Sequence, residues 1–324
     1  MMKFRTATEP LRHQGMISHR TPLMLVGSCF TTSVGARLAA DGFLTSTNPF
    51  GTVYNPASIA QTFMRITTGH PFDEDDAFLS DGLYHSFASH SSMSAPDMDT
   101  FLKNHNEALD SARAFLKEAR IVILTLGTSM VFCRADNGVV VANCHKLPQS
   151  AFTRRRLSVR ECTACLKQTV RSIRAVAPEA TVILTVSPIR HAADGLHGNT
   201  LSKATLHLAI EETLAQTDNT LYFPAFEALV DDLRDYRFYA ADMRHPSDVA
   251  VDYIYSLFAD SFFDHRTKDT AARFADLGKR LAHRPLTANE KAVDDFNTAT
   301  HALAGRLAEE FPYLKKSIDQ LTKQ

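Results

Sequence analysis

The sequence lacks the long apolar runs and the charge excess that would place it in several large classes of protein. No stretch of its 324 residues reaches the ~18 consecutive apolar residues of a membrane-spanning helix, and the N-terminal MMKFRTATEPLRHQG contains no apolar secretion signal. The 35 basic residues balance 36 acidic ones, which gives no general attraction to nucleic acid or to a membrane surface. We therefore expect a globular cytoplasmic protein that binds neither.

Cysteines are few and irregularly spaced. The 5 cysteines are odd in number, which argues against the framework of a small disulfide-rich domain. Cys162 and Cys165 form a CxxC pair, but it lies in an amphipathic helical pattern without a second pair of ligands, which argues against zinc. We expect reduced thiols and no metal site.

What the sequence does contain is an alternation of short buried strands with amphipathic helices. Apolar runs too short for helices predict strands at 22–27, 43–47, 121–127, 181–186 and 221–224. Helices are expected at 29–41, 57–68, 99–118, 156–176 and 200–216, and Asn137-Gly138 predicts a hairpin turn within 130–142. Such an alternation produces right-handed βαβ crossovers and a parallel sheet covered on both faces.

Other segments depart from this alternation. Residues 70–100 are polar and irregular, as functional loops often are, and from about 266 the chain changes to charged, Ala-rich helices. We therefore divide the chain into an α/β domain, residues 1–265, and a C-terminal helical extension, residues 266–324. The extension would cap the sheet, act as a lid or assemble a homo-oligomer. The cationic run 154–156 is expected at the solvated start of a helix.

Candidate functional residues follow the strands, because ligands of parallel sheets bind outside the carboxyl ends of the strands. Ser28 comes directly after the first buried strand and precedes a helix. Its hydroxyl would project above the sheet, where the amides of a helix start can bind a developing negative charge. Ser28 is thus either a nucleophile or only a helix cap. Cys29 is a weaker nucleophile candidate, because its side chain is expected to turn into the helix packing.

Asp242 and His245 favour the nucleophile. A serine needs a base that takes its proton, and the base needs a carboxylate that fixes its tautomer and stabilises its charged form. An Asp and a His three residues apart, on a loop before a helix, supply both groups. By itself the DxxH spacing also occurs often in surface loops without function.

Several short motifs follow one another between residues 20 and 262. They read GSCF at 27–30, NPFGTVYNP at 48–56, TLGTS at 125–129, NCHK at 143–146, TVSPIRH at 185–191, SKA at 202–204, and DYRFY at 235–239 followed by His245-Pro246. Together they resemble the GSCFA family, which is related to the SGNH, or GDSL-like, hydrolases. The resemblance implies an α/β three-layer sandwich of flavodoxin-like (SGNH hydrolase) type, with a parallel sheet.

The resemblance also implies an esterase mechanism without a metal or an organic cofactor. Ser28 would be the nucleophile, His245 the base and Asp242 its carboxylate partner, and the amides of Ser28 and Gly51 would line the oxyanion hole. Where SGNH enzymes carry GxND, this chain reads GTSM at 127–130, so the asparagine donor is absent. Thr128, Ser129 or Asn143 would replace it.

Further polar residues on the same face are candidates for substrate binding. They are His145 and Lys146 after the hairpin, and Arg190 and His191 after the strand at 181–186. They would bind a substrate carboxylate or sugar hydroxyls, or else be satisfied locally in their loops.

The predicted function is hydrolysis of a small acyl ester, such as an O-acetyl group on a carbohydrate. Transfer of the acyl group to a sugar hydroxyl is a variant of the same chemistry. The alternative is a catalytically silent module that binds carbohydrate or peptide on the same fold, which the missing asparagine favours.

Overall fold

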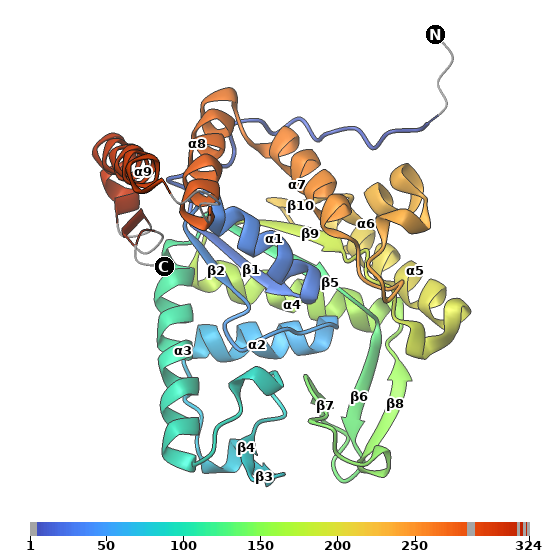
Figure 1. Ribbon diagram of the computed structural model, residues 1–324. Coiled ribbons are helices and arrows are strands. Elements are labelled where there is room, and N and C mark those ends of the chain that lie inside the picture. The colour runs from blue at the N-terminus through green and yellow to red at the C-terminus, as the bar shows by residue number, and fades with distance from the viewer. Residues whose placement is uncertain (1–4, 284–288, 316–317, 320–321, 323–324) are drawn as a thin grey trace.

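The computed structural model describes residues 5–283, 289–315, 318–319 and 322. At its centre lies a parallel five-stranded sheet with the order β10-β9-β5-β1-β2 (Figure 1). Its strands are β1 (Leu23–Gly27), β2 (Thr45–Thr47), β5 (Ile121–Leu126), β9 (Thr181–Val186) and β10 (Thr220–Tyr222). This is the strand order of a flavodoxin-like sheet, so the predicted fold class is confirmed.

Successive residues of each strand face opposite sides of the sheet, which gives the molecule two cores. Along β5, Val122 packs with one set of helices: α2 (Pro56–Thr68), α3 (Met98–Glu118), α4 (Val159–Val176) and α5 (Gly195–Leu214). The next residue, Ile123, packs with the other set: α1 (Cys29–Ala40), α6 (Ala225–Glu227) and α7 (Asp248–Phe262). The helices on both faces make the predicted three-layer sandwich.

A smaller antiparallel sheet, with the order β7-β6-β8, stands apart from the central one. Its strands are β6 (Met130–Arg134), β7 (Val140–Val141) and β8 (Phe152–Arg156). The predicted hairpin is confirmed, because Phe132 of β6 pairs with Val141 of β7. In the nominally irregular segment 70–100, β3 (Phe78–Ser80) and β4 (Leu83–His85) form a two-stranded antiparallel pair.

The expected helix start at 154–156 is wrong. These arginines belong to β8, which pairs with β6. Helix α4 begins at Val159, after the N-cap residue Ser158, which forms a capping box with Glu161 in the first turn. The residues of β8 are largely exposed, so no apolar alternation marks the strand in the sequence.

The C-terminal helices α8 (His265–Ala282) and α9 (Glu290–Glu310) bury a cluster of their own. Phe274 of α8 is fully buried and lies against Gly42, where a Cβ atom would be 2.7 Å from the phenyl ring. Gly42 and Leu44 directly precede β2, so the helices cover the amino end of that strand (Figure 1). Parts of the predicted extension lie outside the described residues, and its boundary at 265 stays a prediction.

Candidate active site

Ser28 stands at the carboxyl end of β1 as the N-cap residue of α1. A serine in this position normally accepts a hydrogen bond from an amide of the first helical turn. Here the side chain makes no such bond, and its Oγ atom is buried without a hydrogen-bond partner. Capping is therefore not what this hydroxyl does.

Close packing holds the turn before Ser28 against strand β5. A Cβ atom on Gly27 would lie 2.3 Å from the carbonyl oxygen of Thr125, so this position requires glycine. The amide of Ser28 donates to the same oxygen at 3.2 Å. This bond occupies an amide that was expected in the oxyanion hole, whereas the amides that follow begin α1 without a side-chain cap.

Asp242 and His245 lie on the loop before α7. Nδ1 of His245 is 2.5 Å from Oδ2 of Asp242, and Oδ1 of Asp242 accepts from the amides of Arg244 and His245 at 2.9 and 3.0 Å. These hydrogen bonds, those from His245 first, hold the pKa of Asp242 far below its usual range. An ionised carboxylate only accepts hydrogen bonds, so Nδ1 carries the proton and Nε2 is left free to act as a base.

Ser28 and His245 line the same cavity, which has a volume of about 740 Å³ and which we call the Ser28 cavity. The small antiparallel sheet forms one wall through Met130, Phe132, Val141, Phe152 and Arg154. The segment that follows β9 forms another wall through residues 189–194. The structure thus brings the expected nucleophile and the expected base to one hollow above the carboxyl ends of the strands.

Cys29 also lines the Ser28 cavity, although it was expected to turn into the helix packing. Its Sγ atom lies 3.6 Å from the hydroxyl of Tyr54. The thiol is therefore near enough to the cavity that an experiment must separate it from Ser28.

Arg154 joins β8 to the segment after β9 across the cavity. It forms an ion pair with Asp194, whose side chain is only 4% exposed, and its guanidinium carbon lies 5.2 Å from the centre of the Phe132 ring. Neither partner was a predicted site residue, because Arg154 was expected at the start of a helix and Asp194 lies in no recognised motif.

His191 reaches the Ser28 cavity from the segment after β9. Its Nε2 atom is buried and has no hydrogen-bond partner. Burial above all, and then the positive charge of Lys203, lower the pKa of His191 to about 4. The imidazole is therefore neutral at physiological pH.

Lys203, which the sequence suggested only as part of a motif, is buried, and its charge acts on His191. Its Nζ donates to the carbonyl oxygens of Gly127 at 2.6 Å and Ser187 at 2.7 Å, so it ties together the carboxyl ends of β5 and β9. Burial lowers the pKa of Lys203 to about 7.

Gly51, which was predicted to line the oxyanion hole, is not among the residues that line the Ser28 cavity. Its amide donates to the carbonyl oxygen of Asn48 at 2.8 Å. The residue borders a separate hollow that it shares with His90 and Ser92. The loop instead reaches the Ser28 cavity at Tyr54 and Asn55.

The three residues expected to replace the missing asparagine all have partners. The hydroxyls of Thr128 and Ser129 bond Ser202 Oγ at 2.9 and 3.1 Å, and the Ser129 amide donates to the same atom. Oδ1 of Asn143 accepts from the amide of His145 at 2.8 Å. Only Thr128 of the three lines the cavity.

The four expected substrate-binding residues divide into two pairs. His145 is buried and bonds the carbonyl oxygen of Ser86 at 2.7 Å, while Lys146 is exposed, and neither lines the Ser28 cavity. Arg190 and His191 do line it. The Arg190 guanidinium lies over the rings of Tyr236 and Tyr239.

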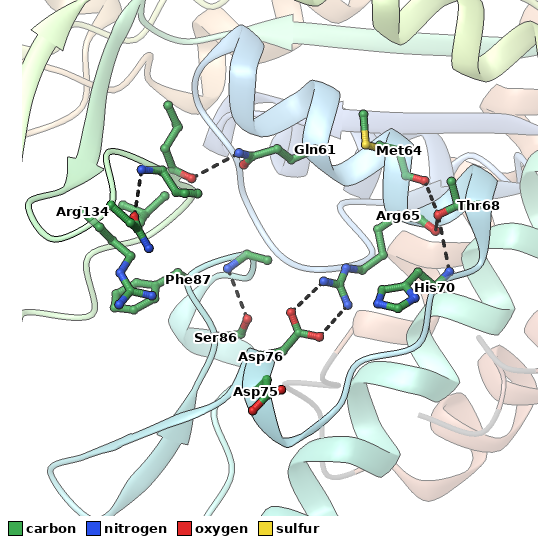
Figure 2. A pocket seen from close by; sticks show the side chains of 15 residues that line it. Gln61, Met64, Arg65, Thr68, His70, Asp75, Asp76, Ser86, Phe87 and Arg134 are labelled. Carbon is green, nitrogen blue, oxygen red and sulfur yellow. Dashed lines mark hydrogen bonds and ion pairs between the residues drawn. The ribbon is translucent and has the colours of Figure 1, made fainter.

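A second cavity, of about 660 Å³, lies between α2, the segment after it and the β6–β7 hairpin, and it shares Val141 with the Ser28 cavity. Figure 2 shows Arg65 reaching across it to Asp76, and the two form hydrogen bonds of 2.8 and 2.7 Å. Arg134 is likewise paired, with Asp136. These charged groups thus neutralise one another in pairs, and the hydroxyl of Thr68, another lining residue, donates to the carbonyl oxygen of Met64 within α2.

Within the described ranges, no three or more His, Cys, Asp and Glu side chains gather as metal ligands would. Among the described helices, none combines the length and the apolar character needed to cross a bilayer.

Comparisons with known proteins identify a family for most of the chain. The sequence profile of the GSCFA family matches residues 22–258. The comparison with curated proteins gives no significant match.

Solved structures of similar shape are distant in sequence. A family 3 carbohydrate esterase of Clostridium thermocellum is 11% identical, with 79% of this chain and 98% of that chain covered and a TM-score of 0.36. A family 3 carbohydrate esterase of Talaromyces cellulolyticus is 10% identical, with 74% and 94% covered and a TM-score of 0.36. An acetyl xylan esterase of the rumen bacterium Butyrivibrio proteoclasticus is 11% identical, with 74% and 63% covered and a TM-score of 0.39. Structural similarity at this level does not support a conclusion about function.

Proposed function

The chain belongs to the GSCFA family, and from this premise we propose that it is a serine hydrolase that cleaves a small acyl ester through an acyl-enzyme on Ser28. One observation carries the proposal. The unpartnered Oγ of Ser28 and the imidazole of His245, which Asp242 anchors, line the same cavity at the carboxyl ends of the strands.

The groups of this cavity suit a two-step acyl transfer. Nε2 of His245 takes the proton of Ser28 while Oγ forms a bond to the carbonyl carbon of the ester. The tetrahedral intermediate collapses, and the alcohol leaves with the proton from His245. Water then attacks the acyl carbon while His245 takes its proton. When the second tetrahedral intermediate collapses, His245 returns that proton to Ser28 Oγ, which releases the acid and restores both groups.

The proposed substrate is a small acyl ester of a polar alcohol, such as an O-acetylated carbohydrate. The apolar wall of the cavity, formed by the β6–β8 sheet, suits a short acyl group, while Arg190 and the Arg154–Asp194 pair offer hydrogen bonds to hydroxyls. If a sugar hydroxyl replaces water in the second step, the same groups make the protein an acyltransferase.

The test is covalent labelling with a fluorophosphonate probe, together with turnover of p-nitrophenyl acetate. We expect wild type to be labelled and active. Ser28→Ala should lose labelling, and both Ser28→Ala and His245→Ala should lose turnover by about 10⁴-fold or more, because nucleophile and base act as one unit. Ser33→Ala is the matched control, since Ser33 lies on α1 and bonds the carbonyl oxygen of Cys29 within the helix.

Labelling that persists in Ser28→Ala and disappears in Cys29→Ala would transfer the role of nucleophile to the thiol. The second candidate function is a silent binding module, which the absence of the GxND asparagine favours. A wild-type protein that is neither labelled nor active, yet binds acetylated oligosaccharides in calorimetry, would replace the hydrolase by that module.

A further inference from the structure

We propose that Nε2–H of His191 occupies the functional place of the absent GxND asparagine and donates a hydrogen bond to the oxyanion. The inference deepens the esterase function proposed above and rests on it. It concerns a residue that the sequence alone suggested only for substrate binding.

The space beside Gly127 places His191 next to the nucleophile. A Cβ atom on Gly127 would lie 3.2 Å from Nε2 of His191 and 3.5 Å from Cβ of Ser28. The carbonyl oxygen of Tyr54, which accepts from the amides of Gly127 and Thr128, would also lie 3.2 Å from that Cβ atom. The imidazole nitrogen, the serine and this carbonyl group therefore surround the position beside Gly127, which residue 127 leaves without a side chain. An oxyanion on a carbonyl carbon bonded to Ser28 Oγ would form at this end of the cavity.

The hydrogen bonds of the other candidate donors favour His191 as the donor to the oxyanion. Buried polar atoms in folded proteins are nearly always paired, and an orphan at a cavity suggests a task. Ser129 donates both its amide and its hydroxyl to Ser202, and the Gly51 amide donates to Asn48. Neither these two residues nor Asn143 lines the Ser28 cavity, and Thr128 Oγ1, which does line it, already shares a hydrogen bond with Ser202 and accepts from the amide of Met130. His191 Nε2 has no partner, although the amide of His191 is fixed to Oδ1 of Asn199 at 2.9 Å.

The charges around His191 suit a neutral donor. Lys203, Arg154 and His245 all lower its pKa, after burial, and the carboxylate in the same cavity, Asp194, is held by Arg154. A neutral imidazole can place its single proton on Nε2 and donate it. The surrounding positive charges disfavour imidazolium and favour a developing oxyanion, which is the preorganised electrostatics that accelerates acyl transfer.

The experiment measures kcat, KM and the rate of fluorophosphonate labelling in His191→Ala, His191→Asn and His191→Gln. We expect His191→Ala to lower kcat by about 10²- to 10³-fold with little change in KM, because an oxyanion is bound more strongly than the ground-state carbonyl. Labelling should slow to a similar extent, since attack on the phosphonate also creates a charged oxygen. An amide side chain should restore part of the loss.

His197→Ala is the matched control, because His197 lies exposed on α5, outside the lining of the Ser28 cavity, and we expect it to keep wild-type kcat. Eventual labelling of Ser28 in each His191 variant shows that the site is folded. Unchanged kcat in His191→Ala would overturn the inference, and so would a rise in KM alone. Loss of the fall in rate at low pH would overturn it too, because His191 would then act as the base and not as a neutral donor. An inactive, unlabelled wild type would overturn the proposed hydrolase as well, whereas an active wild type with active His191→Ala overturns only this inference.

Discussion

Ser28 and His191 contribute buried polar atoms to the Ser28 cavity that have no hydrogen-bond partner. Their neighbours have partners, since Thr128 bonds Ser202 and Asp194, whose Oδ1 atom makes no hydrogen bond, forms an ion pair with Arg154. Leaving a buried polar atom unpaired costs about 1–3 kcal/mol. Two unpaired atoms beside one cavity therefore lower the stability of the protein. A bound substrate that forms hydrogen bonds with them would restore it.

Lys203 makes the stability of the protein depend on pH. Its pKa is about 7 in the folded protein against a usual 10.5, so between these values the unfolded chain binds more protons than the folded one. The free energy of unfolding should therefore rise as pH increases from 7 towards 10, by up to about 1.4 kcal/mol per pH unit from this group. Its neighbours His191 and His207 are themselves bases whose pKa values its charge lowers.

Urea unfolding of wild type and Lys203→Met between pH 7 and 9.5 measures this effect. The difference between the two free energies should grow with pH, because the variant lacks the titrating amine. Lys167→Met, at a surface lysine that bonds Gln216, should run parallel to wild type. Parallel curves for Lys203→Met and wild type would show that Lys203 is not buried as an amine of lowered pKa.

At the scale of elements, the central sheet was predictable and the wall of the cavity was not. Strands β1, β5 and β9 are buried on both faces, so each appears in the sequence as a continuous apolar run. The exposed strand β8 has no such pattern and exists because it pairs with β6. The local sequence of β8 contains no signal of this pairing with β6.

The same distinction applies to the site. Ser28 and the Asp242–His245 pair were found because each lies within a short motif. The hydrogen bond of Gly51 to Asn48 and the bonds of Ser129 to Ser202 depend on distant backbone placement. For this reason the sequence pointed to Ser28 and His245, which line one cavity, but gave no sign that Gly51 would lie outside it.

Arg154 offers a test of how β8 is held to the rest of the molecule. Removing one partner of a buried ion pair leaves an uncompensated charge, and the Asp194 side chain is 4% exposed against 35% for Arg154. We expect Arg154→Met to destabilise the protein by about 2 kcal/mol, a value discounted for the exposure of the arginine. KM should rise as well, because the wall of the Ser28 cavity loosens.

The neighbouring Arg155→Met is the control, because its pair with Glu161 is exposed at both ends, 51% and 42%. Such surface pairs contribute about 1 kcal/mol or less. Denaturant unfolding and esterase kinetics on both variants measure the contrast. Equal losses of stability in the two variants would show that the Arg154–Asp194 pair does not fasten β8.

At the scale of the whole molecule, the Ser28 cavity and the C-terminal helices lie at different ends of the central sheet. Ser28, His191 and the Ser28 cavity lie at the carboxyl ends of β1 and β9. The C-terminal helices meet the sheet at the amino end of β2, next to Gly42 and Leu44. These helices contribute a core of their own to the fold, and no residue that lines the Ser28 cavity belongs to α8 or α9.

A substitution at Phe274 can distinguish whether the C-terminal helices act as a cap or as a lid. Its ring is fully buried, stacks on His19 at 5.7 Å and lies against Gly42. Phe274→Ala should lower the free energy of unfolding by about 3–5 kcal/mol, because it removes apolar contacts and leaves a cavity. Below the melting temperature, kcat/KM should stay at the wild-type value, since no lining residue of the Ser28 cavity belongs to α8.

Thermal unfolding, esterase kinetics and light scattering on Phe274→Ala distinguish the tasks considered for these helices. A lower Tm with unchanged kcat/KM and unchanged mass is the result expected of a cap. A fall in kcat/KM in the folded variant would instead indicate a lid, and a fall in mass would indicate an assembly surface. Phe132→Ala is the reciprocal comparison. Its side chain is 38% exposed on the cavity wall, so it should change KM more than Tm.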